Sequence, residues 1–265
     1  MKENFRSANT IRATPLNLLV DLFRTFPTGL LKVIIGNRVN VMSHEATIEA
    51  LIDGKSLVRW ADGETAIARG KSIGYQKSHP VLMSKLRELS EYDCDNLIFG
   101  LPWTIRIPIW NKKFNLRLIK IHLSSRIFLA QRVHSRRKSN LYGDTLIWYT
   151  KFPEIPEILS LISKDKRVCL IASDSRFLAA CPTQTELIKV SSRNAFEEYT
   201  YLSQRLTSWI RRNQAIGVKS LILLAAGPTS KAIALDFHPS AQCIDIGHGF
   251  NFNFHNKPKY AWESD

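Results

Sequence analysis

The sequence has few cysteines, no long apolar run and, over one long stretch, no acidic residue. Its four cysteines lie far apart without a CxxC spacing, which argues against a zinc ribbon and a disulfide framework and favours a reducing cytosol. No apolar run reaches the roughly 18 residues that a membrane-spanning helix needs, and no secretory leader is recognisable. With 45% hydrophobic and 23% charged residues, the chain has the composition of a globular protein rather than a disordered one.

The positive charge is concentrated in two segments. The 265 residues include 37 Lys and Arg against 23 Asp and Glu, a formal net charge of +14. Residues 1–44 contribute +4, and residues 96–143 contribute +10 because they contain ten basic residues and no acidic one. The rest of the chain is neutral in sum, so an anionic partner is expected at these two segments.

Both segments mix their cations with apolar and aromatic side chains. Leu19, Leu22 and Phe23 belong to an apolar series at helical spacing, and Trp103 and Trp110 lie in the second segment. Such a mixture is typical of a surface that binds an anionic membrane, where each Lys or Arg contributes on the order of 1 kcal/mol. A solvated basic face and a nucleic-acid surface are the alternatives. No recognisable nucleic-acid-binding motif accompanies the charge, so we expect no nucleic acid as partner.

Expected strands and helices alternate along the chain. This alternation predicts an α/β fold, with a mostly parallel sheet covered by helices on both faces. The expected helices span residues 43–54, 155–162 and 195–212, with further helices opening at Pro80 and after Gly227. The expected strands span residues 56–60, 96–101, 167–172, 187–190, 219–226 and 243–246.

The first candidate site follows the strand that ends near Trp60. Asp62 and Glu64 are separated only by Gly63, whose backbone freedom would let the two carboxylates point the same way. Carboxylate oxygens suit Mg²⁺ or Mn²⁺, and Arg59 would add a cation for a phosphate. An ordinary Asp-Gly-Glu turn without a ligand is the alternative interpretation.

The second candidate site is a strand–loop–helix junction. Gly227 and Pro228 precede Thr229 and Ser230, whose hydroxyls and helix N-terminus could bind an anion. The string is neither a Walker loop nor a GxGxxG fingerprint, and a capped helix start without a ligand is the alternative. His248 follows the last expected strand and could contact phosphate, bind a metal or act as a base.

Several short strings follow one another along the chain: Ser56–Glu64, Lys71–Gln76, Tyr142–Thr145, Ser175–Arg176, Asn194–Phe196, Leu221–Lys231, Asp245–His248 and Lys259–Tyr260. Taken together and in this order, they resemble the GT-D-fold glycosyltransferases of bacteria. The similarity covers roughly residues 45–265, which would form the glycosyltransferase domain, whereas residues 1–44 would form a separate basic amphipathic segment. The chain departs from the family pattern at residues 177–182 and at residues 249–254, which contain no acidic residue.

The resemblance implies a Rossmann-like α/β domain that transfers a hexose from a UDP-sugar, with Mn²⁺ or Mg²⁺ near an Asp-x-Glu motif. Asp62 and Glu64 would be that motif, acting in metal binding and catalysis, and Asp144 would activate the acceptor hydroxyl. The residues expected to bind the donor and its phosphates are Arg59, Arg176, Gly227, Pro228, Thr229, Ser230 and His248.

Charge and resemblance together predict a glycosyltransferase held peripherally at the cytoplasmic face of the cell membrane. Its partners would be a UDP-hexose, an anionic membrane surface and a growing surface glycan, linked either to a lipid or to a protein. The rival hypotheses are a non-catalytic module of the same fold that binds a nucleotide or a partner, and a basic nucleic-acid-binding protein.

Overall fold

The computed structural model describes residues 40–101, 141–150 and 154–247. Most of residues 1–44, most of the ten-cation segment and His248 lie outside these ranges, so the expectations for them are not addressed by the fold. Among the described residues, no helix has the length and apolarity needed to cross a membrane.

An eight-stranded sheet forms the centre of the described chain, in the order β1-β4-β3-β2-β8-β7-β5-β6. Every pairing between these strands is parallel, as the alternation of strands and helices predicted. The strands are β1 (Asn40–Val41), β2 (Ser56–Arg59), β3 (Leu97–Leu101), β4 (Leu141–Asp144), β5 (Lys166–Ala172), β6 (Glu186–Lys189), β7 (Lys219–Ala225) and β8 (Gln242–Asp245).

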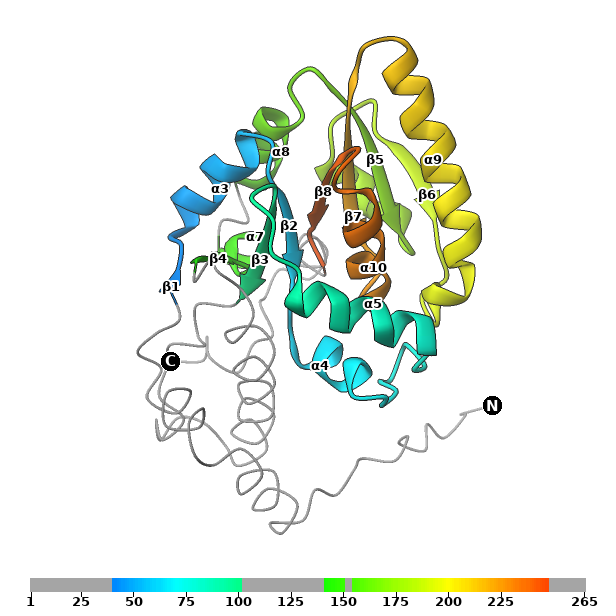
Figure 1. Cartoon of the computed structure of the whole chain (residues 1–265). Coiled ribbons are helices and arrows are strands. Elements are labelled where there is room, and N and C mark those ends of the chain that lie inside the picture. Colours follow the sequence, from blue (N-terminus) through cyan, green and yellow to red (C-terminus); the bar gives the residue numbers. More distant parts are fainter. Residues whose placement is uncertain (1–39, 102–140, 151–153, 248–265) are drawn as a thin grey trace, which may run out of the picture.

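Helices cover both faces of this sheet (Figure 1). One face packs against α4 (Asp62–Ala68), α5 (Pro80–Glu91), α9 (Tyr199–Ala215) and α10 (Pro228–Phe237), together with the 3₁₀ helix η4 (Ala195–Glu198). The other face packs against α3 (His44–Ile52), α7 (Ile147–Thr150) and α8 (Ile155–Ile162), with the 3₁₀ helix η3 (Ser175–Ala180).

Alternate residues of the central strands supply the two apolar layers. In β7, Ile222 and Leu224 pack in the first layer, and Leu221 and Leu223 pack in the second. All four are fully buried, as expected for a parallel strand with a helix layer on each side. The continuous apolar run that predicted this strand reflects that two-sided burial.

The sequence predicted most of the elements with small errors at their ends. Ser43 is the N-cap of α3, as expected, and its hydroxyl accepts a hydrogen bond from the Ala46 amide at 3.1 Å. The structure splits the helix expected at 195–212 into η4 and α9. It also adds α4, η3, α7, β1 and β4, none of which we expected from the sequence.

One expectation about the first candidate site is wrong. Gly63 was expected to use its backbone freedom to turn two carboxylates the same way, but it lies inside α4 and is not among the glycines with positive φ. Residues two apart on a helix do not face each other. Asp62 is accordingly exposed, whereas Glu64 is 4% exposed.

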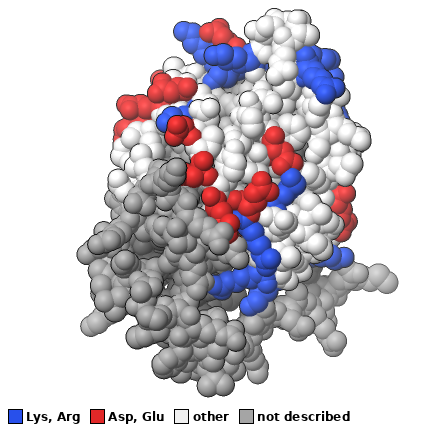
Figure 2. Space-filling view, viewed as in Figure 1, with Lys and Arg blue, Asp and Glu red and all other residues white. Residues whose placement is uncertain are grey.

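The described surface does not repeat the charge asymmetry of the whole chain. On the face drawn in Figure 2, acidic and basic side chains are intermixed. This agrees with the sequence count, in which the cationic excess belongs to residues 1–44 and 96–143.

Gly100 in β3 lies where the sheet leaves no room for a side chain. A Cβ there would lie 2.6 Å from Thr145 Cγ2 and 2.9 Å from the Val58 carbonyl oxygen. Gly100→Ala is therefore expected to lower the free energy of unfolding by about 1–3 kcal/mol, as overpacking does. Urea denaturation measures this change. Gly74→Ala is the matched control, because nothing lies within 4 Å of a Cβ there; equal losses in the two variants would contradict this packing.

Candidate functional site

Three segments that are far apart in sequence meet at the carboxyl ends of β2, β7 and β8. They are the β2–α4 junction around Arg59, the β7–α10 junction around Gly227, and the residues that follow Asp245. Because β2, β8 and β7 are neighbours in the sheet, their carboxyl ends lie side by side. Ligands of open parallel sheets bind at this edge.

A buried ion cluster joins the three segments. Lys231 Nζ lies 2.8 Å from Glu64 Oε1 and 2.7 Å from Asp245 Oδ2. The three side chains are 0–6% exposed. We call Glu64, Lys231 and Asp245 the central ion cluster.

Hydrogen bonds occupy the remaining carboxylate oxygens of the cluster. Glu64 Oε2 accepts from the Ala61 amide at 2.9 Å, which also caps the start of α4. Asp245 Oδ1 accepts from the Gly247 amide at 3.0 Å, and its Oδ2 also accepts from the Arg59 amide at 3.3 Å. Every carboxylate oxygen of the cluster therefore has a donor.

Opposite charges keep Glu64 and Lys231 ionised despite their burial. Burial by itself would raise the pKa of Glu64, but the attraction of Lys231 and the hydrogen bonds to the carboxylate hold that pKa below its ordinary 4.5. Burial by itself would lower the pKa of Lys231, and the charges of Asp245 and Glu64 raise it instead. Glu64 and Lys231 are therefore charged at neutral pH.

Arg59 lies across the end of β8. Its Nη1 donates to the Ile246 carbonyl oxygen at 3.0 Å. Gly247 has a φ of +53°, and a Cβ at that position would lie 1.8 Å from Arg59 Nη1. Glycine is therefore required at position 247 both for its backbone angles and for the approach of the guanidinium. The predicted cation at this edge is present, in contact with the segment that leads to His248.

The Gly-Pro-Thr-Ser string begins α10, as expected, but its hydroxyls face inward. Ser230 Oγ accepts from the Ala226 amide at 2.9 Å. Thr229 is fully buried, and its Oγ1 has no hydrogen-bond partner within the described part of the chain. Pro228 is also buried, which leaves Gly227 as the more accessible residue of the string. These positions make the loop, rather than the two hydroxyls, the accessible part of the junction.

Tyr75 packs against this loop, and sequence reasoning did not select it as a site residue. A Cβ at Gly227, whose φ is +57°, would lie 2.8 Å from Tyr75 Cε2. Tyr75 is 41% exposed. Burial, with the nearby charge of Glu64, raises the pKa of Tyr75 to about 12, so the ring is a neutral phenol at neutral pH. An exposed aromatic ring at this edge can contact a sugar or a base.

Lys231 was also missed as a site residue. The sequence offered one signal for it, the lysine that directly follows Gly-Pro-Thr-Ser. That position is one turn into α10, so the side chain reaches back to the Gly227 carbonyl oxygen at 3.3 Å as well as to the carboxylates. Its carboxylate partners could not be predicted from spacing, because they lie far away in sequence, in α4 and at the end of β8.

The remaining predicted residues lie elsewhere along the edge. Asp144 ends β4 and is 2% exposed, and its Oδ2 is 3.0 Å from His44 Nε2. Arg176 is in η3, which follows β5, and its exposed guanidinium pairs with Asp174. Neither of these two ion pairs includes a member of the central ion cluster. His248 lies outside the described residues.

The geometry favours a divalent metal ion bound by Asp62 alone over one bound by both Asp62 and Glu64. Glu64 already binds Lys231 and the Ala61 amide, whereas Asp62 is exposed at the first position of α4. No group of three or more His, Cys, Asp or Glu side chains within the described ranges could hold a metal ion. Mg²⁺ is commonly bound by one or two carboxylates together with substrate phosphates, so Asp62 remains a competent ligand.

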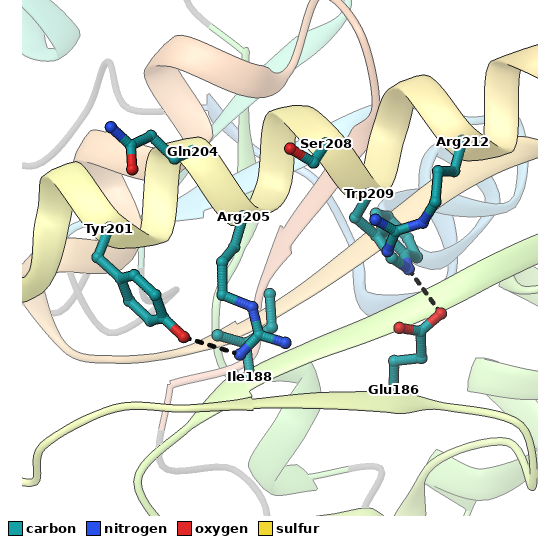
Figure 3. Close-up of a pocket in the computed structure, with 8 residues that line it drawn as sticks. All are labelled: Glu186, Ile188, Tyr201, Gln204, Arg205, Ser208, Trp209 and Arg212. Carbon is teal, nitrogen blue, oxygen red and sulfur yellow. Dashed lines mark hydrogen bonds between the residues drawn. The ribbon is translucent and has the colours of Figure 1, made fainter.

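A separate hollow of about 250 Å³ lies between α9 and β6, at the far end of the sheet (Figure 3). Trp209 Nε1 donates to Glu186 Oε1 at 2.8 Å, and Arg205 Nη1 donates to Tyr201 Oη at 3.2 Å. None of the residues predicted from the sequence lines this hollow. The candidate site is therefore the carboxyl edge and not this concavity.

The structure defines a parallel α/β protein in which charged side chains from three segments meet beyond the strand ends. The sequence profile described as the glycosyltransferase GT-D fold matches residues 57–256. The chain therefore belongs to the GT-D glycosyltransferase family. No curated protein matches the chain.

Solved structures agree with this fold. A structure reported as a new glycosyltransferase (DUF1792) from Streptococcus sanguinis is similar with a TM-score of 0.62 and 21% identity, over 86% of this chain and 93% of that one. Another, reported as showing that the highly conserved domain of unknown function 1792 has a distinct glycosyltransferase fold, has a TM-score of 0.61 and 19% identity, over 89% and 93%. At these identities the similarity shows the fold alone.

Replacing Lys231 by Met is expected to cost about 3–5 kcal/mol of unfolding free energy at pH 7, because two buried carboxylates lose their counter-charge. Because the pKa of Glu64 is depressed, its ion pair stabilises the fold above about pH 4.5 and this stabilisation is lost as the pH falls further. The difference in the free energy of unfolding between Lys231→Met and the wild type is therefore expected to decrease at acidic pH. Urea denaturation across pH measures it.

Lys85→Met is the matched control for this substitution. Lys85 Nζ lies 2.6 Å from Asp236 Oδ1, but both side chains are partly exposed, at 20% and 35%. Replacing Lys85 is expected to lower the free energy of unfolding by about 0–1 kcal/mol. Equal costs for the two lysine variants at pH 7 would contradict the structural importance of the central ion cluster.

Proposed function

We propose that this protein is a metal-dependent hexosyltransferase that uses a UDP-sugar and extends a surface glycan at the cytoplasmic face of the cell membrane. The observation that carries the proposal is the meeting of three strand ends at the central ion cluster, in a member of the GT-D family. The glycan would be linked to a lipid or to a protein.

The residues at this edge suit a nucleoside diphosphate. Departure of UDP requires that negative charge developing on the diphosphate be stabilised, and preorganised cations and dipoles achieve this. Arg59 supplies a guanidinium at the end of β2, and α10 directs the positive end of its dipole toward the same edge. Tyr75 offers an aromatic surface for the sugar or the base. Gly227 allows the ring to approach the loop.

Asp62 is the residue proposed to hold the divalent cation, together with the phosphates of the donor. When bound, Mn²⁺ or Mg²⁺ would neutralise charge on the leaving diphosphate. Glu64 acts differently in this proposal, because its carboxylate positions Lys231 and closes the first turn of α4. Arg176 and His248 stay predicted donor-binding residues, and Asp144 stays a predicted participant in acceptor activation.

The membrane part of the proposal is supported by the charge distribution. Residues 96–143 carry ten cations and end directly before Asp144, which lies at the carboxyl edge of the sheet. This segment, which precedes Asp144 in the sequence, would favour an acceptor confined to an anionic bilayer surface. Residues 1–44 would add a second basic and amphipathic contact.

The donor part is tested by titrating UDP, UDP-glucose, UDP-galactose and UDP-N-acetylglucosamine into the protein, with Mn²⁺ and with EDTA. We expect binding that requires Mn²⁺, and we expect Asp62→Ala to weaken it at least tenfold, about 1.4 kcal/mol. Asp62 is preferred to Glu64 for this test because replacing Glu64 would also remove a partner of buried Lys231. Isothermal titration calorimetry gives both affinities.

Asp95→Ala is the control, since Asp95 is an exposed carboxylate away from this edge, in the loop before β3. It is expected to bind UDP as the wild type does. Equal UDP affinity in Mn²⁺ and EDTA would refute the metal dependence. No binding of any of the four nucleotides would favour a non-catalytic module of the same fold.

A further inference from the structure

A histidine and a carboxylate face each other at the carboxyl end of β4. His44 Nε2 lies 3.0 Å from Asp144 Oδ2. The side chain of Asp144 is 3% exposed and that of His44 is 23% exposed. The histidine is therefore the member of the pair that solvent, or a substrate hydroxyl, can reach.

The surroundings of Asp144 hold its carboxylate in place. Its Oδ1 accepts from the Leu146 amide at 2.8 Å, and its own amide donates to Thr47 Oγ1 at 3.0 Å. Both carboxylate oxygens therefore have a partner on the protein. A carboxylate used in this way is better suited to orient a neighbouring imidazole than to take a proton from an acceptor itself.

The pair lies on the same edge as the proposed donor site. In the strand register, Arg59 of β2 pairs with Gly100 of β3, and Gly100 pairs with Gly143 of β4. Asp144 therefore lies one residue closer to the carboxyl edge than the position that corresponds to Arg59. With a spacing of about 4.8 Å between neighbouring strands, β4 lies roughly 10 Å from β2. His44 begins α3, directly after β1, which pairs with β4. The pair therefore flanks the donor residues on one side.

We propose that His44 is the base that activates the acceptor hydroxyl, and that Asp144 is the residue that positions it. This inference rests on the proposed function, and it assigns to His44 the activation of the acceptor hydroxyl that was expected of Asp144. In neutral imidazole, a hydrogen bond to the carboxylate places the proton on Nε2, so Nδ1 is the nitrogen that accepts the substrate proton. General-base catalysis of this kind contributes typically about 10²–10⁴-fold to a rate.

The step balances without a further reagent. The acceptor O–H bond breaks and its proton passes to His44, while the acceptor oxygen forms a bond to C1 of the hexose. The bond between C1 and the diphosphate oxygen breaks, and its electron pair leaves with UDP. Because the displacement is direct, the configuration at C1 inverts. When water is the acceptor, the same step hydrolyses the donor.

A purely structural contact between α3 and β4 is the alternative role for the pair. Other contacts already make that connection. Thr47 Oγ1 accepts from the Asp144 amide, and a Cβ at Gly143 would lie 3.5 Å from Thr47 Cγ2, so the helix packs closely on the strand. Docking of α3 therefore does not require an imidazole at position 44.

The test uses the full chain, with UDP-glucose, UDP-galactose and UDP-N-acetylglucosamine in Mn²⁺, and follows UDP release with water as acceptor. His44→Gln keeps an amide that can donate toward Asp144 but has no basic nitrogen. We expect release by this variant to fall about 100-fold or more, with the affinity for UDP unchanged. His44→Ala is expected to regain activity when imidazole is added. The hexose first released by the wild type is expected to have the inverted configuration by NMR.

His79→Ala is the matched control, because His79 also lies at a helix start, as the N-cap of α5, and is not part of the site. It is expected to keep wild-type activity without a response to imidazole. Activity of His44→Gln within about threefold of the wild type, no recovery of His44→Ala with imidazole, or retained configuration at C1 would each overturn the role of His44. Failure of the wild type itself to bind UDP or hydrolyse any donor would remove the proposed function, and this inference with it.

Discussion

One buried ammonium group organises the site of this protein. Lys231 reaches from the first turn of α10 to carboxylates that begin α4 and end β8, so three strand ends are tied to a single charge. Two carboxylates at this depth would be strongly destabilising without it. Arg59, Gly227 and Gly247 take their positions around this contact. The cluster therefore determines the shape of the edge on which donor chemistry is proposed.

The buried carboxylates of this edge make their contacts within the protein, and more exposed side chains lie beside them. Glu64 and Asp245 have all their oxygens committed to the protein, whereas Asp62 is exposed on the same turn as Glu64. The end of β4 is similar. There the Leu146 amide donates to the carboxylate of Asp144, and His44 is the more exposed member of the pair. In both places a buried carboxylate pairs with a nitrogen base, Lys231 at the first and His44 at the second. Such rigid support suits a site that must stabilise charge as a bond breaks.

Local signals in the sequence predicted the fold, whereas the contacts between the strand ends are long-range. The apolar run of β7 and the cap at Ser43 are local signals, and both were correct. Spacing alone suggested that Asp62 and Glu64 act together, but helix geometry points them apart. The pairing of Lys231 with Asp245, and of His44 with Asp144, depends on strand order. Strand order is a long-range property that local patterns do not encode.

Hydrogen–deuterium exchange with and without UDP and Mn²⁺ tests the central claim, that the three strand ends form one donor site. If they do, UDP slows exchange together in residues 61–64, 226–229 and 246–247, with no change in α9 and β6 around the distant hollow. Slowed exchange confined to α9 and β6, or in only one of the three segments, would contradict it.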